Sequence, residues 1–236
     1  MKMKNLLMCG ALLATTLSSG GSVFAADYTD ATTAKTDAII QFEKDEDPTN
    51  PVDPGDPTNP VDPTDPTNPT GGELMINYAS KLDFGTHKKT ETTFHAKADE
   101  MKDGSKVTPF VSVKDSRGTD RKGWSLTAKQ DDAFKDSNGN ELTGAELKLS
   151  NLFSGNGQVG APAVSGGEIV LNDTDQEIAS ADATTGIGVH SIGLGQLQAD
   201  DTTNGVQLNV PNSTVKNTDQ YKTTVTYTLT ADPTNP

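Results

Sequence analysis

Two short segments each place an aromatic residue and a leucine two positions apart, the spacing of side chains on one face of a strand. These side chains are the ones best suited to binding chemistry. Trp124 and Leu126 form one pair, and Tyr227 and Leu229 form another near the C-terminus, with Tyr221 at the same parity. Because side chains alternate faces along a strand, each set would share one face. Exposed rings of this kind stack on the apolar faces of sugars. Buried rings are ordinary core residues, which is the interpretation that we favour here.

Catalytic chemistry has weak support in this sequence. His87, His95 and His190 show no spacing typical of zinc ligands. His190 precedes Ser191, but no Gly-x-Ser-x-Gly elbow surrounds the serine. The carboxylates are too numerous to single out a hydrolytic pair. We therefore expect no enzyme, no cofactor and no metal site.

The segment 136–140, Asp-Ser-Asn-Gly-Asn, has the composition of a calcium loop but not its pattern. An EF-hand loop needs Gly at its sixth position and Glu at its twelfth, where this chain has Glu141 and Leu147. Asn138-Gly139 is a strong tight-turn signal, so we predict a turn.

The region that must position these residues, 72–236, is rich in Thr, Val and Gly and shows no helical period. It predicts an all-β domain, a sandwich or a barrel, with a mobile Gly-rich loop at 153–167. The segments 74–78 and 81–85 are expected to form one or two short strands. Further strands are expected at 108–113, 123–129, 145–149, 168–171, 205–210 and 222–230.

The segment 47–71 is dominated by proline and aspartate. From 48 to 69, proline occupies every third position. Polyproline II has three residues per turn, so the spacing predicts a stiff, extended and solvated spacer. The preceding segment, 26–46, contains the apolar run 38–42, which we expect to pair with the β domain as a strand.

The N-terminus has the features of an export signal. Lys2 and Lys4 precede a short apolar run, and small residues at Val23 and Ala25 predict a signal peptide over 1–25, cleaved after Ala25. Cys9, the only cysteine, lies within it. No membrane anchor or covalent sorting tail is evident, so we expect a secreted protein.

Charge argues against a nucleic-acid partner. The chain has 19 basic and 33 acidic residues, a formal net charge of -14, whereas nucleic-acid binders usually present a basic face. Residues 81–122 are an exception, with 10 basic and 7 acidic residues. We interpret this basic island as an ordinary mixed surface.

An ordered set of motifs resembles the WxL-domain surface proteins of Gram-positive bacteria, in their small, single-domain form. The first signature, Trp124-Ser125-Leu126, is intact, and the second retains its Tyr, Leu and Pro. In the second signature Val225 replaces the usual Leu and Tyr227 replaces the usual Trp. Further matches are the segments 115–118, 82–85, 205–206 and 210–211, together with Gly123.

The resemblance implies a cell-surface protein that attaches non-covalently to the peptidoglycan of the cell wall through this β domain. It also implies other surface proteins as partners and, for some members, binding to host extracellular matrix. The alternative is a structural or adhesin subunit that a partner protein holds at the surface and that binds host matrix. The resemblance assigns the binding signature to Trp124, Leu126, Tyr221, Tyr227 and Leu229.

Overall fold

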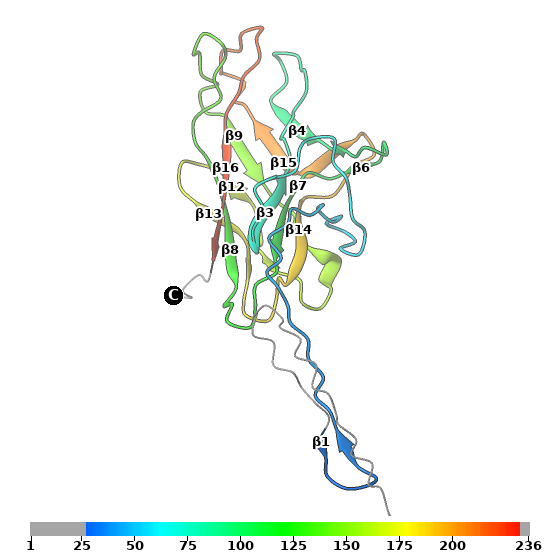
Figure 1. The fold of residues 1–236 in the computed structure, drawn as a ribbon. Helices are drawn as coiled ribbons and strands as arrows, with labels where there is room; N and C mark the ends of the chain where they lie inside the picture. The colour runs from blue at the N-terminus through cyan, green and yellow to red at the C-terminus, as the bar shows by residue number, and fades with distance from the viewer. Residues whose placement is uncertain (1–26, 232–236) are drawn as a thin grey trace, which may run out of the picture. The chain divides into compact units, whose positions relative to one another are not determined.

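The computed structural model describes residues 27–231, in which all regular structure is β except for one short 3-10 helix, η1 (Gly155–Gly157) (Figure 1). The expected signal peptide lies outside the described residues, as do residues 232–236. The chain divides into two compact units, Met1–Glu43 and Lys44–Pro236. No helix in the described part is long and apolar enough to span a membrane.

The first unit contains a small antiparallel ladder of β1 (Asp27–Tyr28) and β2 (Ala34–Lys35). Residues 38–42 form no strand, so the prediction of a pairing strand there is wrong. The side chains of Ile39, Ile40 and Phe42 are 66%, 76% and 82% exposed. Apolar side chains alone do not form a strand, because a strand also requires a neighbouring strand for its backbone hydrogen bonds.

The second unit consists mainly of three four-stranded antiparallel sheets in a sandwich-like arrangement, which confirms the all-β prediction (Figure 1). One sheet has the order β10 (Leu152–Phe153), β14 (Gly188–Leu194), β7 (Phe110–Asp115), β3 (Leu74–Ala79). The second has the order β11 (Ala163–Val164), β13 (Gln176–Ala181), β8 (Trp124–Gln130), β16 (Val225–Ala231). The third has the order β12 (Ile169–Val170), β9 (Glu146–Leu149), β15 (Thr202–Asn209), β4 (Thr93–Lys97). A separate short ladder joins β5 (Asp99–Glu100) to β6 (Lys106–Val107).

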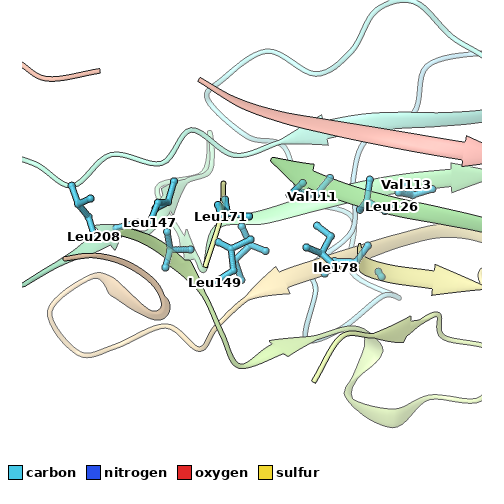
Figure 2. Close-up of a cluster of buried hydrophobic side chains, with 14 of the residues drawn as sticks. Val111, Val113, Leu126, Leu147, Leu149, Leu171, Ile178 and Leu208 are labelled. Atoms are coloured by element: carbon cyan, nitrogen blue, oxygen red, sulfur yellow. The ribbon is translucent and has the colours of Figure 1, made fainter. Parts of the chain in front are cut away.

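The main core collects alternate side chains from all three sheets (Figure 2). Val111 and Val113 come from β7, Leu126 from β8 and Ile178 from β13, and each is at most 1% exposed. Alternation along the strands explains why residues two apart reach the same core. Burial of these aliphatic side chains supplies the main driving force for the fold.

Strand β7 is buried on both faces, because a further layer covers the face turned away from the main core. Its alternate residues Phe110, Ser112 and Lys114 are at most 2% exposed. Phe110 packs in a second cluster with Tyr78, Met101, Val107 and Val61, and Val61 belongs to the proline-rich segment. The proline-rich segment is therefore part of the folded body.

The structure corrects the prediction of an extended, solvated spacer. The backbone reverses between an antiparallel bridge at Val52 and Pro60, and the Val61 N–H donates to the Pro51 carbonyl at 2.9 Å. The carboxylate of Asp53 accepts the Gly55 N–H at 2.7 Å, which forms a turn. A proline every third residue is compatible with such turns, in which the carboxylates of Asp53 and Asp56 accept backbone N–H groups.

The proline-rich segment is joined to β3 and β7 by hydrogen bonds. The Asn68 backbone N–H donates to the Asn77 carbonyl at 2.8 Å, and the Asn68 side-chain amide donates to the Ile76 carbonyl at 2.7 Å. The buried Lys114 ammonium donates to the Asp47 carbonyl at 2.8 Å and to the Asp45 carboxylate at 2.9 Å. The Asn68 contacts cover β3, the edge strand of its sheet, which would otherwise be open to strand addition.

Seven of the eight predicted strands coincide with strands of the structure, but 81–85 does not. There the Gly85 N–H binds the Asp83 carboxylate at 2.8 Å, and Gly85 has a φ of +77°, so the chain turns. Among the strands of four or more residues, β4, β13 and β14 were not predicted. The Gly-rich segment 153–167 contains η1 and β11.

Candidate functional site

Trp124 begins β8, which is an inner strand of its sheet, with β13 on one side and β16 on the other. Trp124, Leu126 and Ala128 are each 0% exposed. The predicted sharing of one face is confirmed, and that face is the core. A side chain without solvent exposure cannot stack on a sugar, so Trp124 and Leu126 serve the fold.

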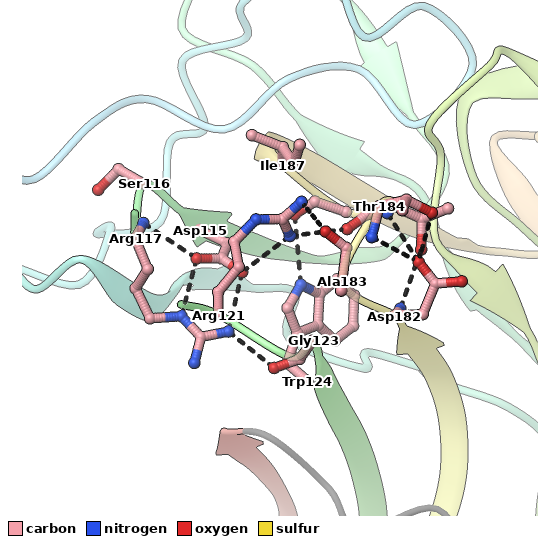
Figure 3. Close-up of polar contacts among 12 residues, drawn as sticks. Asp115, Ser116, Arg117, Arg121, Gly123, Trp124, Asp182, Ala183, Thr184 and Ile187 are labelled. Atoms are coloured by element: carbon pink, nitrogen blue, oxygen red, sulfur yellow. Dashed lines mark hydrogen bonds and ion pairs between the residues drawn. The ribbon is translucent and has the colours of Figure 1, made fainter. Parts of the chain in front are cut away.

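A charged network surrounds the entry to β8 (Figure 3). The fully buried Asp115 carboxylate accepts two hydrogen bonds from the Arg117 guanidinium, both at 2.9 Å. Arg117 also donates to the Gly123 carbonyl at 2.7 Å, and Arg121 lies 3.8 Å from Asp115. The motif residues 115–118 therefore fix the backbone just before Trp124, and bidentate pairing gives that position geometric precision.

The turn 182–186 closes over the tryptophan. The Asp182 carboxylate accepts the backbone N–H groups of Thr184 and Thr185 at 2.7 and 3.0 Å. The Trp124 indole N–H donates to the Gly186 carbonyl at 3.3 Å (Figure 3). The indole thus buries its apolar ring and satisfies its only polar group.

Gly123 is required by close backbone approach. A Cβ at this position would lie 2.0 Å from the Ala181 carbonyl oxygen, and φ is +111°. Only glycine adopts this conformation without strain. The glycine before the tryptophan in the first signature is explained by this contact.

The second signature lies beside the first. β16 pairs with β8 in antiparallel register, which places Leu229 opposite Leu126 and Tyr227 opposite Ala128. The Tyr227 ring is half-buried, and its hydroxyl is buried with no hydrogen-bond partner among the described residues. Burial raises the pKa of Tyr227 above its usual value.

Tyr221, the first residue of the second signature, is half-buried and held by a polar network rather than by a strand. Its hydroxyl accepts the Asn217 N–H at 2.8 Å, and the Asn217 side chain donates to Asp136 at 2.9 Å. Hydrogen bonds from Asn217, and then from Asn140 and Asn138, lower the pKa of Asp136 to about 2. The carboxylate that resembled a calcium ligand is thus satisfied by protein donors, and the predicted turn at 136–140 is confirmed.

Tyr221 and Tyr227 line a pocket of about 690 Å³, which we call the lysine cleft. Its lining comes from two loops, 80–89 and 216–225, and from core side chains beneath them. The aromatic lining residues are Phe84, Phe94, Phe134, His87, Tyr221 and Tyr227. The lysines of the lining are Lys81, Lys88, Lys89, Lys216 and Lys222. Pockets with an apolar lining and a few polar groups are the usual form of ligand sites.

His190, Ser191 and Asp99 are engaged in structural contacts. His190 Nε2 lies 2.9 Å from the Ile187 carbonyl oxygen, to which its N–H donates, and burial lowers the pKa of His190. Ser191 donates to the Val52 carbonyl and not to His190. Burial raises the pKa of Asp99, which accepts hydrogen bonds from Tyr78 and Ser80. No cluster of three or more His, Cys, Asp or Glu suited to a metal occurs among residues 27–231.

Of the five signature residues, the structure brings Leu126 and Leu229 together in one layer and leaves Tyr221 and Tyr227 at the lysine cleft. The cleft itself was missed by sequence reasoning. A signal for it was present in the basic island 81–122, which contributes three of the five cleft lysines.

The chain was compared with family models, curated proteins and solved structures. The model of a family described as "WxL domain surface cell wall-binding" matches residues 29–233. No curated protein and no solved structure matches the chain.

Proposed function

Because the chain belongs to the WxL family of surface cell wall-binding domains, we propose that it attaches non-covalently to the peptidoglycan of a Gram-positive cell wall. The observation that carries this proposal is the extent of the family match, from residue 29 to residue 233. It includes the three sheets and the proline-rich layer, so the description applies to the whole folded body and not to one motif.

The buried state of Trp124 and Leu126 separates the signature from the contact surface. Both side chains are 0% exposed, so we assign them to the fold. The half-buried Tyr221 and Tyr227, from the second signature, line the lysine cleft beside β16. We place the wall contact there, because aromatic side chains on a concave surface suit carbohydrate rings.

We also propose that the protein is exported before it binds the wall. The pattern over residues 1–25 is that of a secretory signal, and a family of surface wall-binding domains requires a route out of the cell. We further propose binding without catalysis, since His190 and Ser191 do not contact each other and both are engaged with backbone carbonyls.

The test is retention on isolated cell walls. Purified protein mixed with washed walls should sediment with them and should be released by denaturant but not by washing. Protein that stays in the supernatant would overturn the proposal. Turbidity of the wall suspension is recorded in parallel, and its loss would instead identify a hydrolase.

A second candidate is a structural or adhesin subunit that a partner surface protein holds in place, with host matrix as its ligand. The exposed apolar side chains of Ile39, Ile40 and Phe42 favour it, because an apolar run with exposed fractions of 66–82% suits a protein partner. In that case the protein alone would not sediment with walls, but it would do so after addition of its partner.

A further inference from the structure

The lysine cleft differs in charge from the rest of the chain. The chain as a whole has a formal net charge of -14. The cleft lining has five lysines against two aspartates, Asp83 and Asp219. A cationic cleft on an acidic protein concentrates anionic ligands locally and repels them elsewhere.

The two aspartates of the lining are already engaged. Asp83 lies 3.5 Å from the Lys97 ammonium, and its carboxylate accepts the Gly85 N–H. Asp219 accepts the Ser137 hydroxyl at 2.6 Å. The five cleft lysines, in contrast, form no ion pair within 4.0 Å among the described residues; they are Lys81, Lys88, Lys89, Lys216 and Lys222. Lys81 still interacts electrostatically with Asp83, and Lys88 with Glu91, but none of the five ammonium groups is held in a direct ion pair in the described part of the chain.

Aromatic rings lie among these lysines. Phe84 packs edge-on against Phe134 with ring centroids 6.4 Å apart, and His87 packs against Phe94 at 4.7 Å. Across the lining, Tyr221 adds a ring from the other loop. Rings next to ammonium groups suit a ligand that alternates apolar sugar faces with negative groups.

The two loops are fixed before any ligand binds. The Tyr221 hydroxyl and the Asn217 side chain connect one loop to Asp136, and the backbones of Lys135 and Lys222 exchange hydrogen bonds at 2.9 Å. Next to the other loop, the Glu91 carboxylate accepts a hydrogen bond from the Lys88 backbone N–H at 2.9 Å. A site that is already ordered loses less entropy on binding.

We propose that the lysine cleft binds an anionic saccharide or polyol chain, with its negative groups on the lysines and its apolar C–H surfaces on Phe84 and Tyr221. This proposal rests on the proposed wall-binding function and specifies the chemistry that the wall must present. Negative groups of this kind come from two sources, phosphodiesters of a polyol phosphate polymer or carboxylates of peptidoglycan fragments. Lysine accepts either as a point charge.

Calorimetric titration of the purified chain tests the proposal with three probes: poly(glycerol phosphate), soluble peptidoglycan fragments with free carboxylates, and neutral chitotetraose. We expect at least one anionic probe to bind about ten-fold more tightly than chitotetraose at low salt, and we expect the difference to shrink as salt is raised. The tighter of the two anionic probes identifies the source. Equal affinity for all three probes, or no binding, would overturn the proposal.

A pair of triple variants supplies the control. Lys88→Gln/Lys89→Gln/Lys222→Gln removes three charges from the cleft, and Lys102→Gln/Lys106→Gln/Lys129→Gln removes three from elsewhere. The cleft variant should bind the anionic probe about ten-fold more weakly, and the matched variant less than about three-fold. Equal losses in both would contradict a specific cleft. A cleft variant that no longer binds the anionic probe but still sediments with walls would support the cleft as the anion site and place the wall contact elsewhere. A cleft variant that binds the probe with wild-type affinity would overturn the cleft proposal alone.

Discussion

Leu126 in β8 lies directly opposite Leu229 in β16, so the leucines of the two signatures are antiparallel cross-strand partners. The same register sets Tyr227 beside Ala128. Two motifs that are distant in the sequence are therefore one structural unit, with the first at its buried centre and the second at its edge. Their co-occurrence in the chain follows from this pairing, since the two strands are hydrogen-bonded neighbours in one sheet.

Replacement of Trp124 should destabilise the domain rather than remove a contact with the ligand. The side chain is 0% exposed and its indole N–H binds the Gly186 carbonyl at 3.3 Å. Trp124→Ala should lower the free energy of unfolding by about 3–5 kcal/mol. Urea denaturation followed by far-UV circular dichroism measures this loss.

Trp124→Phe is the matched control, because it keeps a ring in the core and removes the indole donor. Its loss of stability should be smaller than that of the alanine variant. Both variants, compared at equal folded concentration, should retain the wild-type affinity for walls. An alanine variant of unchanged stability that no longer sediments would show that Trp124 contacts the ligand directly.

Gly123→Ala should destabilise the protein by more than about 2 kcal/mol. The added Cβ would lie 2.0 Å from the Ala181 carbonyl oxygen, in a backbone conformation with φ of +111°. Gly166→Ala is the control, because a Cβ there meets nothing within 4 Å, and it should change stability by less than about 0.5 kcal/mol. The melting temperatures of the two variants, measured by thermal unfolding under the same conditions, test this difference. Equal melting temperatures would refute the steric argument.

Periodicity located most of the long strands because their alternation is a local property. Strand β8 shows it well, with Trp124, Leu126 and Ala128 on one face. The proline-rich segment defeated the same reasoning. Its spacing of three matches polyproline II, but its structure is set by long-range partners, such as Lys114 for Asp47 and Phe110 for Val61. No pattern within the segment encodes a partner elsewhere in the chain.

The candidate site was predictable only in its parts. Tyr221 and Tyr227 were singled out from their spacing, and Lys81, Lys88 and Lys89 were recognised as part of a basic island. Their meeting in one cleft depends on how loops 80–89 and 216–225 are folded back onto the sheets. That arrangement is tertiary, so strand periodicity does not contain it.

The proline-rich layer should protect its amide protons. The Val61 N–H is bonded to the Pro51 carbonyl at 2.9 Å, and the Lys102 N–H to the Asp62 carbonyl at 2.8 Å. Native-state hydrogen exchange at both amides should be slower than in an unstructured chain by on the order of 100-fold or more. A free polyproline II spacer would exchange at the unstructured rate. Val61→Asp should abolish the protection, whereas Val159→Asp, at a fully exposed valine, should leave it intact.

Asp136 should make stability depend on acid pH. Its pKa is about 2 in the folded protein and 3.8 in an unperturbed chain, so the unfolded state binds the proton more readily. The stability that Asp136 contributes is therefore fully present above pH 3.8 and is lost as the pH falls toward 2. The difference in urea midpoint between the wild type and Asp136→Asn should shrink between pH 5 and pH 2. Asp175→Asn removes the same charge at an exposed position and serves as control; a difference for Asp136→Asn that stays constant with pH would refute the linkage.

Tyr227 and Tyr78 should respond in opposite directions to loss of the hydroxyl. The Tyr227 hydroxyl is buried with no hydrogen-bond partner in the described part of the chain, whereas the Tyr78 hydroxyl donates to Asp99 at 2.8 Å. Unfolding hydrates both hydroxyls, so Tyr227 loses hydrogen bonding on folding and Tyr78 does not. Tyr227→Phe should therefore raise the free energy of unfolding by about 1 kcal/mol, and Tyr78→Phe should lower it by about 1–2 kcal/mol. Urea denaturation of the two variants under one set of conditions gives both values, and a loss of stability in Tyr227→Phe would mean that its hydroxyl is hydrogen-bonded in the folded protein.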